Sequence, residues 1–330
     1  MDGPAGDPRQ VTRNVGILTS GGDASGMNAA IRAVTRTAAS IGIQVVGFER
    51  GFDGLVNNAR TELGSRAVSG ILEQGGTILK SARSEVFKTE AGLRSAAENV
   101  RANNLEGLIV IGGNGSQTGG YLLHKLGIPV VGVASTIDND LFGFDYTIGF
   151  DTAVNVAIDA IDRIRDVAES HDRVFVVEVM GRDNGSIALE SGLATGADIV
   201  LVPELPFSMQ DIITHLQGDV VARKMHHIIV IAEGAGSAED LSRYINAKLP
   251  VEARSTVLGY VQRGGKPTRF DRILATEAGE AALLALAGGQ SGVVAGTRDG
   301  HIVLQDALEA VTKRNLLKPQ LVELLNRVSI

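Results

Sequence analysis

Cysteine and tryptophan are absent from this sequence of 330 residues. Without cysteine, the chain can form no disulfide bond, no thiolate nucleophile and no cysteine-ligated zinc site. Aromatic residues make up only 4% of the sequence, so the core must be built from Ala, Val, Ile and Leu. Such a core suits a parallel α/β sheet better than an aromatic-rich β-sandwich.

The sequence also lacks a long apolar run and a basic excess, and we expect its first residues not to be a signal peptide. No apolar run reaches the ~18 residues that suggest a membrane-spanning helix. The first twelve residues are polar and contain Gly and Pro, and we expect residues 1–12 to be a disordered extension. The net charge of −7 argues against non-specific binding of nucleic acid, which needs a basic surface. We therefore expect a cytoplasmic protein with neither a membrane nor nucleic acid as partner.

Short apolar runs alternate with longer helical patterns along the whole chain. Between the first two runs, Met27, Ile31, Val34 and Ala38 recur at helical spacing. Buried strands that alternate with helices predict parallel sheets covered on both faces, and the length predicts about two domains. We expect strands at 14–22, 44–48, 107–113, 129–133, 173–181, 198–203 and 226–236, with a candidate domain junction near 140–150.

Five of the predicted strand ends carry unusually polar, often glycine-rich loops. In open α/β sheets, ligands bind at the carboxyl ends of the strands, so chemistry is expected in these loops. None is a P-loop, and no G-x-G-x-x-G is followed by an acidic residue at the end of the next strand, which disfavours a dinucleotide site. The loops are TSGGDASGMN (19–28), IGGNGSQTGG (111–120), STIDND (135–140), EVMGRDNGS (178–186) and IAEGAG (231–236).

The loop STIDND places two carboxylates, Asp138 and Asp140, just after a predicted strand. One could accept a proton from a hydroxyl while the other helps to hold a metal ion, as phosphoryl transfer requires. An Asx-turn that caps the next segment is the alternative explanation for a lone D-x-D pair. Arginines, which suit phosphate, lie at strand ends or in glycine-rich turns: Arg173, Arg182, Arg254 and Arg263. The combination favours an enzyme that acts on phosphorylated small molecules.

Six segments, in this order and spacing, resemble the signature segments of the 6-phosphofructokinase family. They are LTSGGDASGMNAAIR, GGNGS, TIDND, DYTIGFDTA, VVEVMGR and TVLGYVQRGG, and the resemblance runs from about Val15 to beyond Asp271. It implies two similar parallel-sheet α/β domains that face each other across an active-site cleft, in a homotetramer whose sites are shared between subunits. It also implies a larger donor-binding domain of 13–149 plus about 262–312, and a smaller sugar-phosphate domain of 150–261 plus about 313–330.

The resemblance further implies a role for individual residues. Asp138 would be the base that takes the proton from the attacking hydroxyl of the sugar, and Asp140 would help to organise Mg²⁺. Catalysis would also use Thr136, Arg182 and Gly22. The phosphoryl donor would be held by Gly22, Arg83, Ser84, Gly113, Asn114, Gly115 and Ser116. The sugar phosphate would be bound by Thr136, Asp138, Met180, Gly181, Arg182 and Glu233, and by Arg173 and Arg254 of the adjacent subunit alongside Tyr260 and Arg263.

Asn114 departs from the family pattern, because an aspartate associated with magnesium usually stands there. Asparagine keeps an oxygen but loses a negative charge, and magnesium prefers carboxylate and phosphate oxygens. We expect metal ligands at Asn114 and Asp140, with the site leaning on Asp140, Asp23 and the donor itself.

The donor and the acceptor depend on a few other positions. The small residues Gly115 and Ser135 leave room for ATP, whereas Tyr260 is commoner among pyrophosphate users and Lys80 is a cation where glycine is usual. We favour ATP as donor and fructose 6-phosphate as acceptor. A pyrophosphate-dependent enzyme remains the alternative. So does a kinase of another ketose phosphate such as sedoheptulose 7-phosphate, because Tyr260 and Ser25 replace the usual histidine and proline.

A nucleotide effector site of bacterial members is matched only in part. Its positions correspond to Arg32, Arg36, Arg165 and Lys224, but Ser65 and Ala222 stand where further cations are usual. We expect effector control to be weakened or absent. A catalytically dead regulatory subunit would be expected to lose Asp138 or Arg182, and lipid and NAD kinases lack the MGR and QRGG segments.

Overall fold

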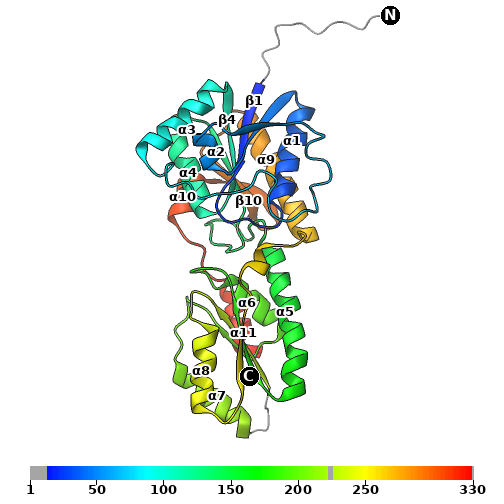
Figure 1. Ribbon diagram of the computed structural model, residues 1–330, viewed down its shortest axis with the longest axis vertical. Helices are drawn as coiled ribbons and strands as arrows, with labels where there is room; N and C mark the ends of the chain where they lie inside the picture. Colours follow the sequence, from blue (N-terminus) through cyan, green and yellow to red (C-terminus); the bar gives the residue numbers. More distant parts are fainter. Residues whose placement is uncertain (1–12, 222–225, 329–330) are drawn as a thin grey trace, which may run out of the picture.

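Two separate β-sheets organise the chain, each in its own α/β domain (Figure 1). The computed structural model describes residues 13–221 and 226–328. The larger domain contains the sheet of order β11-β10-β5-β4-β1-β2-β3, and the smaller domain contains the sheet of order β7-β8-β6-β9. The expected α/β class with parallel sheets in two domains is confirmed. The expectation of disorder for residues 1–12 lies outside the described residues.

The larger sheet is parallel at its centre and antiparallel at both edges, where β3 pairs with β2 and β11 with β10. Its inner strands are apolar throughout: in β4 all residues but Glu106 are buried, as expected for a strand covered on both faces. The strands are β1 (Arg13–Thr19), β2 (Ile43–Phe48), β3 (Arg60–Leu63), β4 (Leu105–Gly112), β5 (Val130–Ala134), β10 (Val293–Arg298) and β11 (His301–Asp306).

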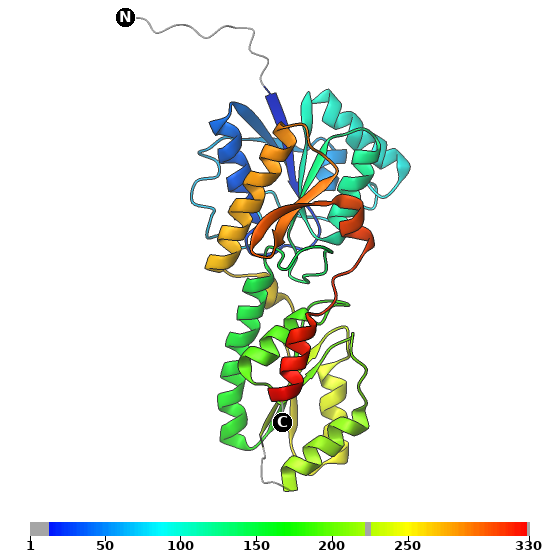
Figure 2. The same cartoon turned by 180° about the vertical axis from the view of Figure 1, so that it is seen from behind.

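Helices cover both faces of this sheet. On one face α1 packs against α9, and on the other α4 packs against α3 and α10 (Figures 1 and 2). The helices are α1 (Met27–Ser40), α2 (Phe52–Val56), α3 (Glu90–Ala102), α4 (Asn114–Lys125), α9 (Arg269–Ala287) and α10 (Ala307–Thr312).

The smaller sheet is fully parallel, with β6 between β8 and β9. Its strands are β6 (Val174–Val179), β7 (Ile199–Leu201), β8 (His227–Ala232) and β9 (Ala253–Val257). The accompanying helices are α5 (Phe150–His171), α6 (Ser186–Thr195), α7 (Met209–Val221), α8 (Ala238–Lys248), the 3-10 helix η1 (Gly259–Arg263) and α11 (Pro319–Val328). None of the helices in the described part of the chain combines the length and apolarity that crossing a bilayer requires.

The apolar core continues from one domain into the other. A single cluster of buried side chains runs from Ile31 of α1 through Phe150 and Ile161 of α5 to Val177 of β6. The two sheets are therefore held in one packed body rather than joined by a bare linker, and loops at their facing ends have defined relative positions.

The seven strands expected from the sequence are all present, although β7 is shorter than the apolar run 198–203. The expected helix with Ile31, Val34 and Ala38 on its buried face is α1. The strands β3, β9, β10 and β11 had no counterpart in the sequence prediction. Three of them lie at sheet edges, where a strand needs no continuous apolar run.

Candidate active site

Three adjacent strands of the larger sheet, β5, β4 and β1, end beside one another, and their loops form one wall of a cavity of about 340 Å³. The turn after β6 in the smaller domain forms part of the opposite wall. The cavity thus lies in a cleft between the two domains. It is lined by most of the residues that the sequence singled out: Gly22, Arg83, Ser84, Gly113, Asn114, Gly115, Ser116, Thr136, Asp138, Asp140, Met180, Arg182 and Arg263.

Asp138 is the most buried acid of the cavity, with 7% of its surface exposed. Its Oδ2 lies 3.3 Å from Nε of Arg182, which reaches across from the smaller domain. Burial raises the pKa of the Asp138 carboxyl to about 6, helped by Asp140 and opposed by the nearby arginine. An acid with such a pKa is largely ionised near neutral pH and can still accept a proton, as a general base must.

Arg182 is held in place by its backbone. It has a positive φ of 53°, and its N–H donates to Oε1 of Glu233 at 2.7 Å. The N–H of Gly181 donates to the same carboxylate at 3.2 Å, and the N–H of Met180 donates to Oε1 of Gln262 at 2.8 Å. Gly181 and Glu233 are absent from the lining of the cavity, and through these hydrogen bonds they support the turn. Gln262 was not singled out in the sequence, because no local pattern connects it to Met180.

Arg263 forms the second cationic contact of the cavity. Its guanidinium pairs with the Asp23 carboxylate, and a Cβ at Gly22 would come within 3.1 Å of Nη2 of Arg263. A side chain at position 22 would therefore crowd the guanidinium of Arg263. Ser25 stands where the family usually has proline, and its hydroxyl lies 2.9 Å from the carbonyl oxygen of Gly265 and donates to it. In this chain serine ties the first loop to the loop that carries Arg263.

The cavity offers polar atoms that fit a divalent cation and a phosphate. Oδ1 of Asp140 and Oγ of Ser116 are buried, and neither has a hydrogen-bond partner within the described residues. Burial raises the pKa of Asp140, so a bound cation would offset the cost of its charge. Within 13–221 and 226–328 no group of three or more His, Asp or Glu side chains is arranged as a metal site. A cation here would need oxygens of the substrate as well.

Arg173, Arg254 and Tyr260 do not line the cavity of their own chain. Arg173 precedes β6 and Arg254 lies near the start of β9, at the amino ends of strands whose carboxyl ends face the cleft. Seven residues of strand from Arg173 to Met180 span roughly 23 Å. Both arginines pair with Glu252, and Nε of Arg173 lies 2.7 Å from its Oε2. Tyr260 is 77% exposed.

Three of the candidate effector residues, Arg32, Arg36 and Arg165, are absent from the lining of the cavity. Arg32 and Arg36 lie on α1, whereas Arg165 lies on α5 and donates to the carbonyl oxygen of Thr195 at 2.5 Å. Lys224 lies outside the described residues. Lys80 also lies outside the cavity wall. It has a φ of 58°, and its Nζ is 3.8 Å from Oε2 of Glu49.

The cavity has a wall that the sequence did not predict. Phe52 and Phe87 are stacked, with ring centroids 4.1 Å apart, and both line the cavity together with Lys88. Because the chain contains few aromatic residues, each ring is unusual, and this scarcity is the sequence signal that could have drawn attention to these two. A flat apolar wall beside cationic side chains suits a ligand with a ring and a charged group.

Comparison with known proteins yields concordant matches. A family model described as Phosphofructokinase matches residues 14–286. The ATP-dependent 6-phosphofructokinase 1 of Thermus thermophilus is 50% identical over 315 residues, which cover 94% of this chain and 98% of that protein. The ATP-dependent 6-phosphofructokinase of Clostridium tetani is 49% identical over 317 residues, covering 96% and 99%. The crystal structure of Pichia pastoris phosphofructokinase in the T-state has a TM-score of 0.87 and 34% identity, covering 98% of this chain and 37% of that longer one.

Proposed function

The chain belongs to the phosphofructokinase family, and we propose that it is an ATP-dependent 6-phosphofructokinase that works with Asp138 as general base. The reaction moves the terminal phosphoryl group of ATP to the 1-hydroxyl of fructose 6-phosphate, giving fructose 1,6-bisphosphate in glycolysis. The observation that carries the proposal is the contact of Asp138 with Arg182 across the cleft. This contact lies where loops of both domains meet.

Asp138 takes the proton from the 1-hydroxyl as its oxygen attacks the terminal phosphorus. The bond from that phosphorus to the bridging oxygen of ATP breaks, and ADP leaves with the electron pair. Arg182 stabilises the negative charge of the phosphoryl group during transfer. The hydroxyl of Thr136 accepts the N–H of Asp138 at 3.2 Å, so its own proton is free to donate to the same phosphoryl group.

The donor is held by the loops of the larger domain. Gly22 gives the phosphates close access to the backbone, and the N-terminus of α4 presents N–H groups and a partial positive charge. A divalent cation such as magnesium would neutralise part of the donor's charge, and Asp140 and Asn114 would hold it. We assign the remaining donor contacts to Arg83, Ser84, Gly113, Gly115 and Ser116, which all line the cavity. The names of the relatives support ATP over pyrophosphate.

The sugar phosphate is assigned to the smaller domain and to a neighbouring subunit. Met180, Gly181, Arg182 and Glu233 would hold the sugar, and Tyr260 and Arg263 its phosphate. Because Arg173 and Arg254 lie at the far end of their strands, they can serve only the cavity of another copy. The family resemblance implies a homotetramer, and we propose this assembly with sites shared between subunits.

We further propose that 13–149 plus about 262–312 bind the donor and that 150–261 plus about 313–330 bind the sugar phosphate. The enzyme is proposed to work in the cytoplasm, where ATP and sugar phosphates are available. Control by a nucleotide effector through Arg32, Arg36, Arg165 and Lys224 is proposed to be weak or absent. A shift of the fructose 6-phosphate saturation curve by ADP or phosphoenolpyruvate would contradict this last point.

A product assay tests the proposed function. The purified chain is incubated with magnesium, with ATP or pyrophosphate as donor and fructose 6-phosphate or sedoheptulose 7-phosphate as acceptor. Turnover is expected with ATP and fructose 6-phosphate. Turnover confined to pyrophosphate, or to the heptulose, would show that Tyr260 and Asn114 mark a changed substrate. Asp138→Asn, purified in the same way, controls for a contaminating kinase.

A further inference from the structure

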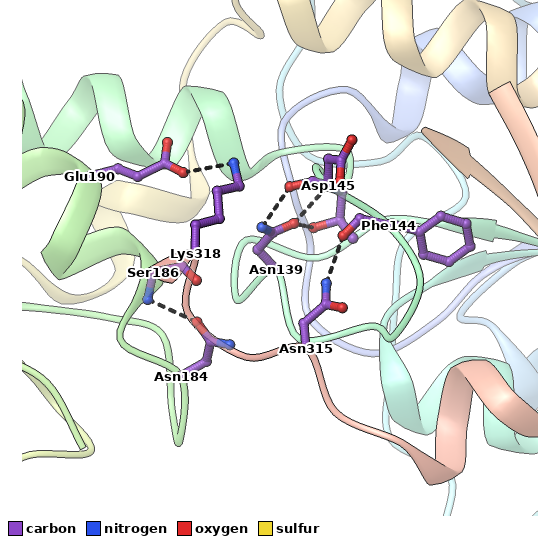
Figure 3. Close-up of polar contacts among 9 residues, drawn as sticks. Asn139, Phe144, Asp145, Asn184, Ser186, Glu190, Asn315 and Lys318 are labelled. Atoms are coloured by element: carbon purple, nitrogen blue, oxygen red, sulfur yellow. Dashed lines mark hydrogen bonds and ion pairs between the residues drawn. The ribbon is translucent and has the colours of Figure 1, made fainter. Parts of the chain in front are cut away.

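A second cavity, of about 120 Å³, lies on the other side of the loop that carries Asp138. Asp138 and Asp140 line the candidate active site, whereas Asn139 between them lines this second cavity. Its other walls come from the loop after Asp140, from α6 of the smaller domain, and from residues 313–318 (Figure 3). We call 313–318, which join α10 to α11, the connecting segment.

Both the oxygen and the nitrogen of the Asn139 side-chain amide form hydrogen bonds to the backbone. Its backbone is left-handed, with a φ of 51°, which a non-glycine residue keeps only where its surroundings hold it. Its Oδ1 accepts the N–H of Thr147 at 2.9 Å, and its Nδ2 donates to the carbonyl oxygen of Asp145 at 3.0 Å. The hydroxyl of Thr147 donates to the carbonyl oxygen of Thr136 at 2.6 Å. The backbone on both sides of Asp138 is thus fixed by residues 145–147.

Asn315 of the connecting segment holds the start of that same stretch. Its Oδ1 accepts the N–H of Gly143 at 3.2 Å, and its Nδ2 donates to the carbonyl oxygen of Phe144 at 2.7 Å (Figure 3). One side chain of the connecting segment therefore binds two backbone groups that directly precede residues 145–147, the residues that fix the backbone around Asp138.

Lys318 links the connecting segment to the smaller domain. Its Nζ lies 3.2 Å from Oε1 of Glu190 on α6 (Figure 3), and 3.9 Å from the ring centroid of Tyr146. The side chains of Lys318 and Glu190 are only 28% and 20% exposed. Their attraction is therefore less screened by water than that of a surface pair.

Glu190 belongs to the helix that follows the Arg182 turn. Between them, Oδ1 of Asn184 accepts the N–H of Ser186 at 2.8 Å (Figure 3), which fixes the entry into α6. A displacement of α6 would therefore move Arg182 as well.

We propose that the connecting segment positions Asp138 against Arg182. Asn315 holds the loop that supports Asp138. Lys318 pairs with Glu190 and so holds α6, the helix that follows the Arg182 turn. This inference rests on the proposed kinase activity. Asn315, Lys318 and Glu190 do not line the candidate active site, so they are positioning residues rather than catalytic ones. Their effect falls on the 3.3 Å contact between Asp138 and Arg182, and transfer rates respond steeply to displacements of about 1 Å.

Lys318→Met in the full chain tests the proposal, because methionine keeps the length of the side chain and removes its charge. We expect kcat to fall roughly ten- to a hundredfold, while the KM for ATP stays within about twofold, since the donor loops belong to the larger domain. Lys318→Arg should restore most of kcat. Glu190→Gln, which keeps the shape of the side chain, should lower kcat in the same direction and covers the case in which Lys318→Met does not fold.

The matched control is Lys313→Met, in the same segment. Lys313 pairs with Glu309 and lies over Phe142, both in the larger domain, so its loss should leave kcat unchanged. A Lys318→Met enzyme as active as Lys313→Met, or one whose KM for ATP rises in step with the loss of kcat, would overturn the inference. A wild-type chain without turnover on any donor and acceptor would instead overturn the proposed function.

Discussion

Burial raises the pKa of Asp138 to about 6, and its neighbours act in both directions: Asp140 and Glu233 raise the pKa, while Arg182 and Arg263 lower it. A general base works only when ionised, so activity should be lost as the pH falls through this value. We expect kcat/KM for fructose 6-phosphate to fall about tenfold for each pH unit below 6. A rate profile from pH 5 to 8 measures this, and a flat profile down to pH 5 would contradict it.

Asp138→Asn removes the base while keeping the size of the side chain. We expect kcat to fall on the order of 10²–10⁴-fold, with the KM for ATP largely unchanged, because the donor loops are separate from this carboxylate. Steady-state kinetics with ATP and fructose 6-phosphate provide the measurement. Turnover near the wild-type value would remove Asp138 from the mechanism.

Asn114 is the first residue of α4 and lines the cavity. Asn114→Asp would add a carboxylate to the cavity that Asp140 also lines, which strengthens a magnesium site, and an acidic side chain also suits a helix N-terminus. We expect the magnesium concentration at half-maximal rate to fall. A magnesium titration of both proteins measures it, and identical titrations would show that residue 114 does not govern the metal.

At the scale of the elements, Asp271 joins two helices that belong to different domains. It lies at the start of α9, with no exposed surface. Its oxygens accept the N–H of Gly149 at 2.9 Å and the N–H of Thr152 at 2.8 Å, both at the start of α5. This buried carboxylate therefore fixes the position of α5, whose side chains carry the core from one sheet to the other.

Asp271→Asn would place an amide N–H against one of these donors. A buried polar group left without a partner costs about 1–3 kcal/mol, and more when a charge is involved, so we expect the free energy of unfolding to fall by about 2–4 kcal/mol. Urea denaturation measures the change. Asp159→Asn, at an exposed position of α5 where the carboxylate pairs with Arg163, is the control and should stay within about 0.5 kcal/mol of wild type. Equal stabilities of the two variants would contradict the role of Asp271.

At the scale of the whole molecule, the proposed sharing of sites between subunits can be tested by complementation. Asp138→Asn removes the base of a subunit's own site, whereas Arg254→Ala removes an arginine that would serve a neighbour. Each variant alone should have little activity. When the two are dissociated and reassembled together, some sites combine an intact Asp138 from one subunit with an intact Arg254 from its neighbour. Random assembly should restore up to about a quarter of the wild-type rate.

The control for complementation mixes Asp138→Asn with Arg182→Ala. These two residues belong to the same subunit's site and contact each other, so no hybrid contains both in one intact cavity and no activity should return. Equal recovery in both mixtures, or none in either, would contradict a site shared through Arg254.

Local sequence patterns were sufficient for the α/β class and for the polar loops at the strand ends, and the family resemblance identified most residues of the cavity wall. Strand patterns such as 107–113 and 129–133 are local, and in a parallel sheet the carboxyl ends of neighbouring strands meet at one edge. The loops after β1, β4 and β5 were therefore expected to carry the chemistry, and the sheet order places them side by side. The edge strands β3 and β11 escaped prediction because their burial is partial and their partners are set by the fold.

Pairings between segments far apart in the chain were decided only by the tertiary structure. The sequence provides Arg182, Arg263 and Asp271 but does not say that they meet Asp138, Asp23 and the start of α5. Nor does any local pattern place Lys318 beside Glu190. A strand or a helix follows from the periodicity of neighbouring residues, whereas these contacts depend on how the two domains pack against each other. For this protein the sequence determined the chemistry available, and the packing of the domains determined which groups face one another.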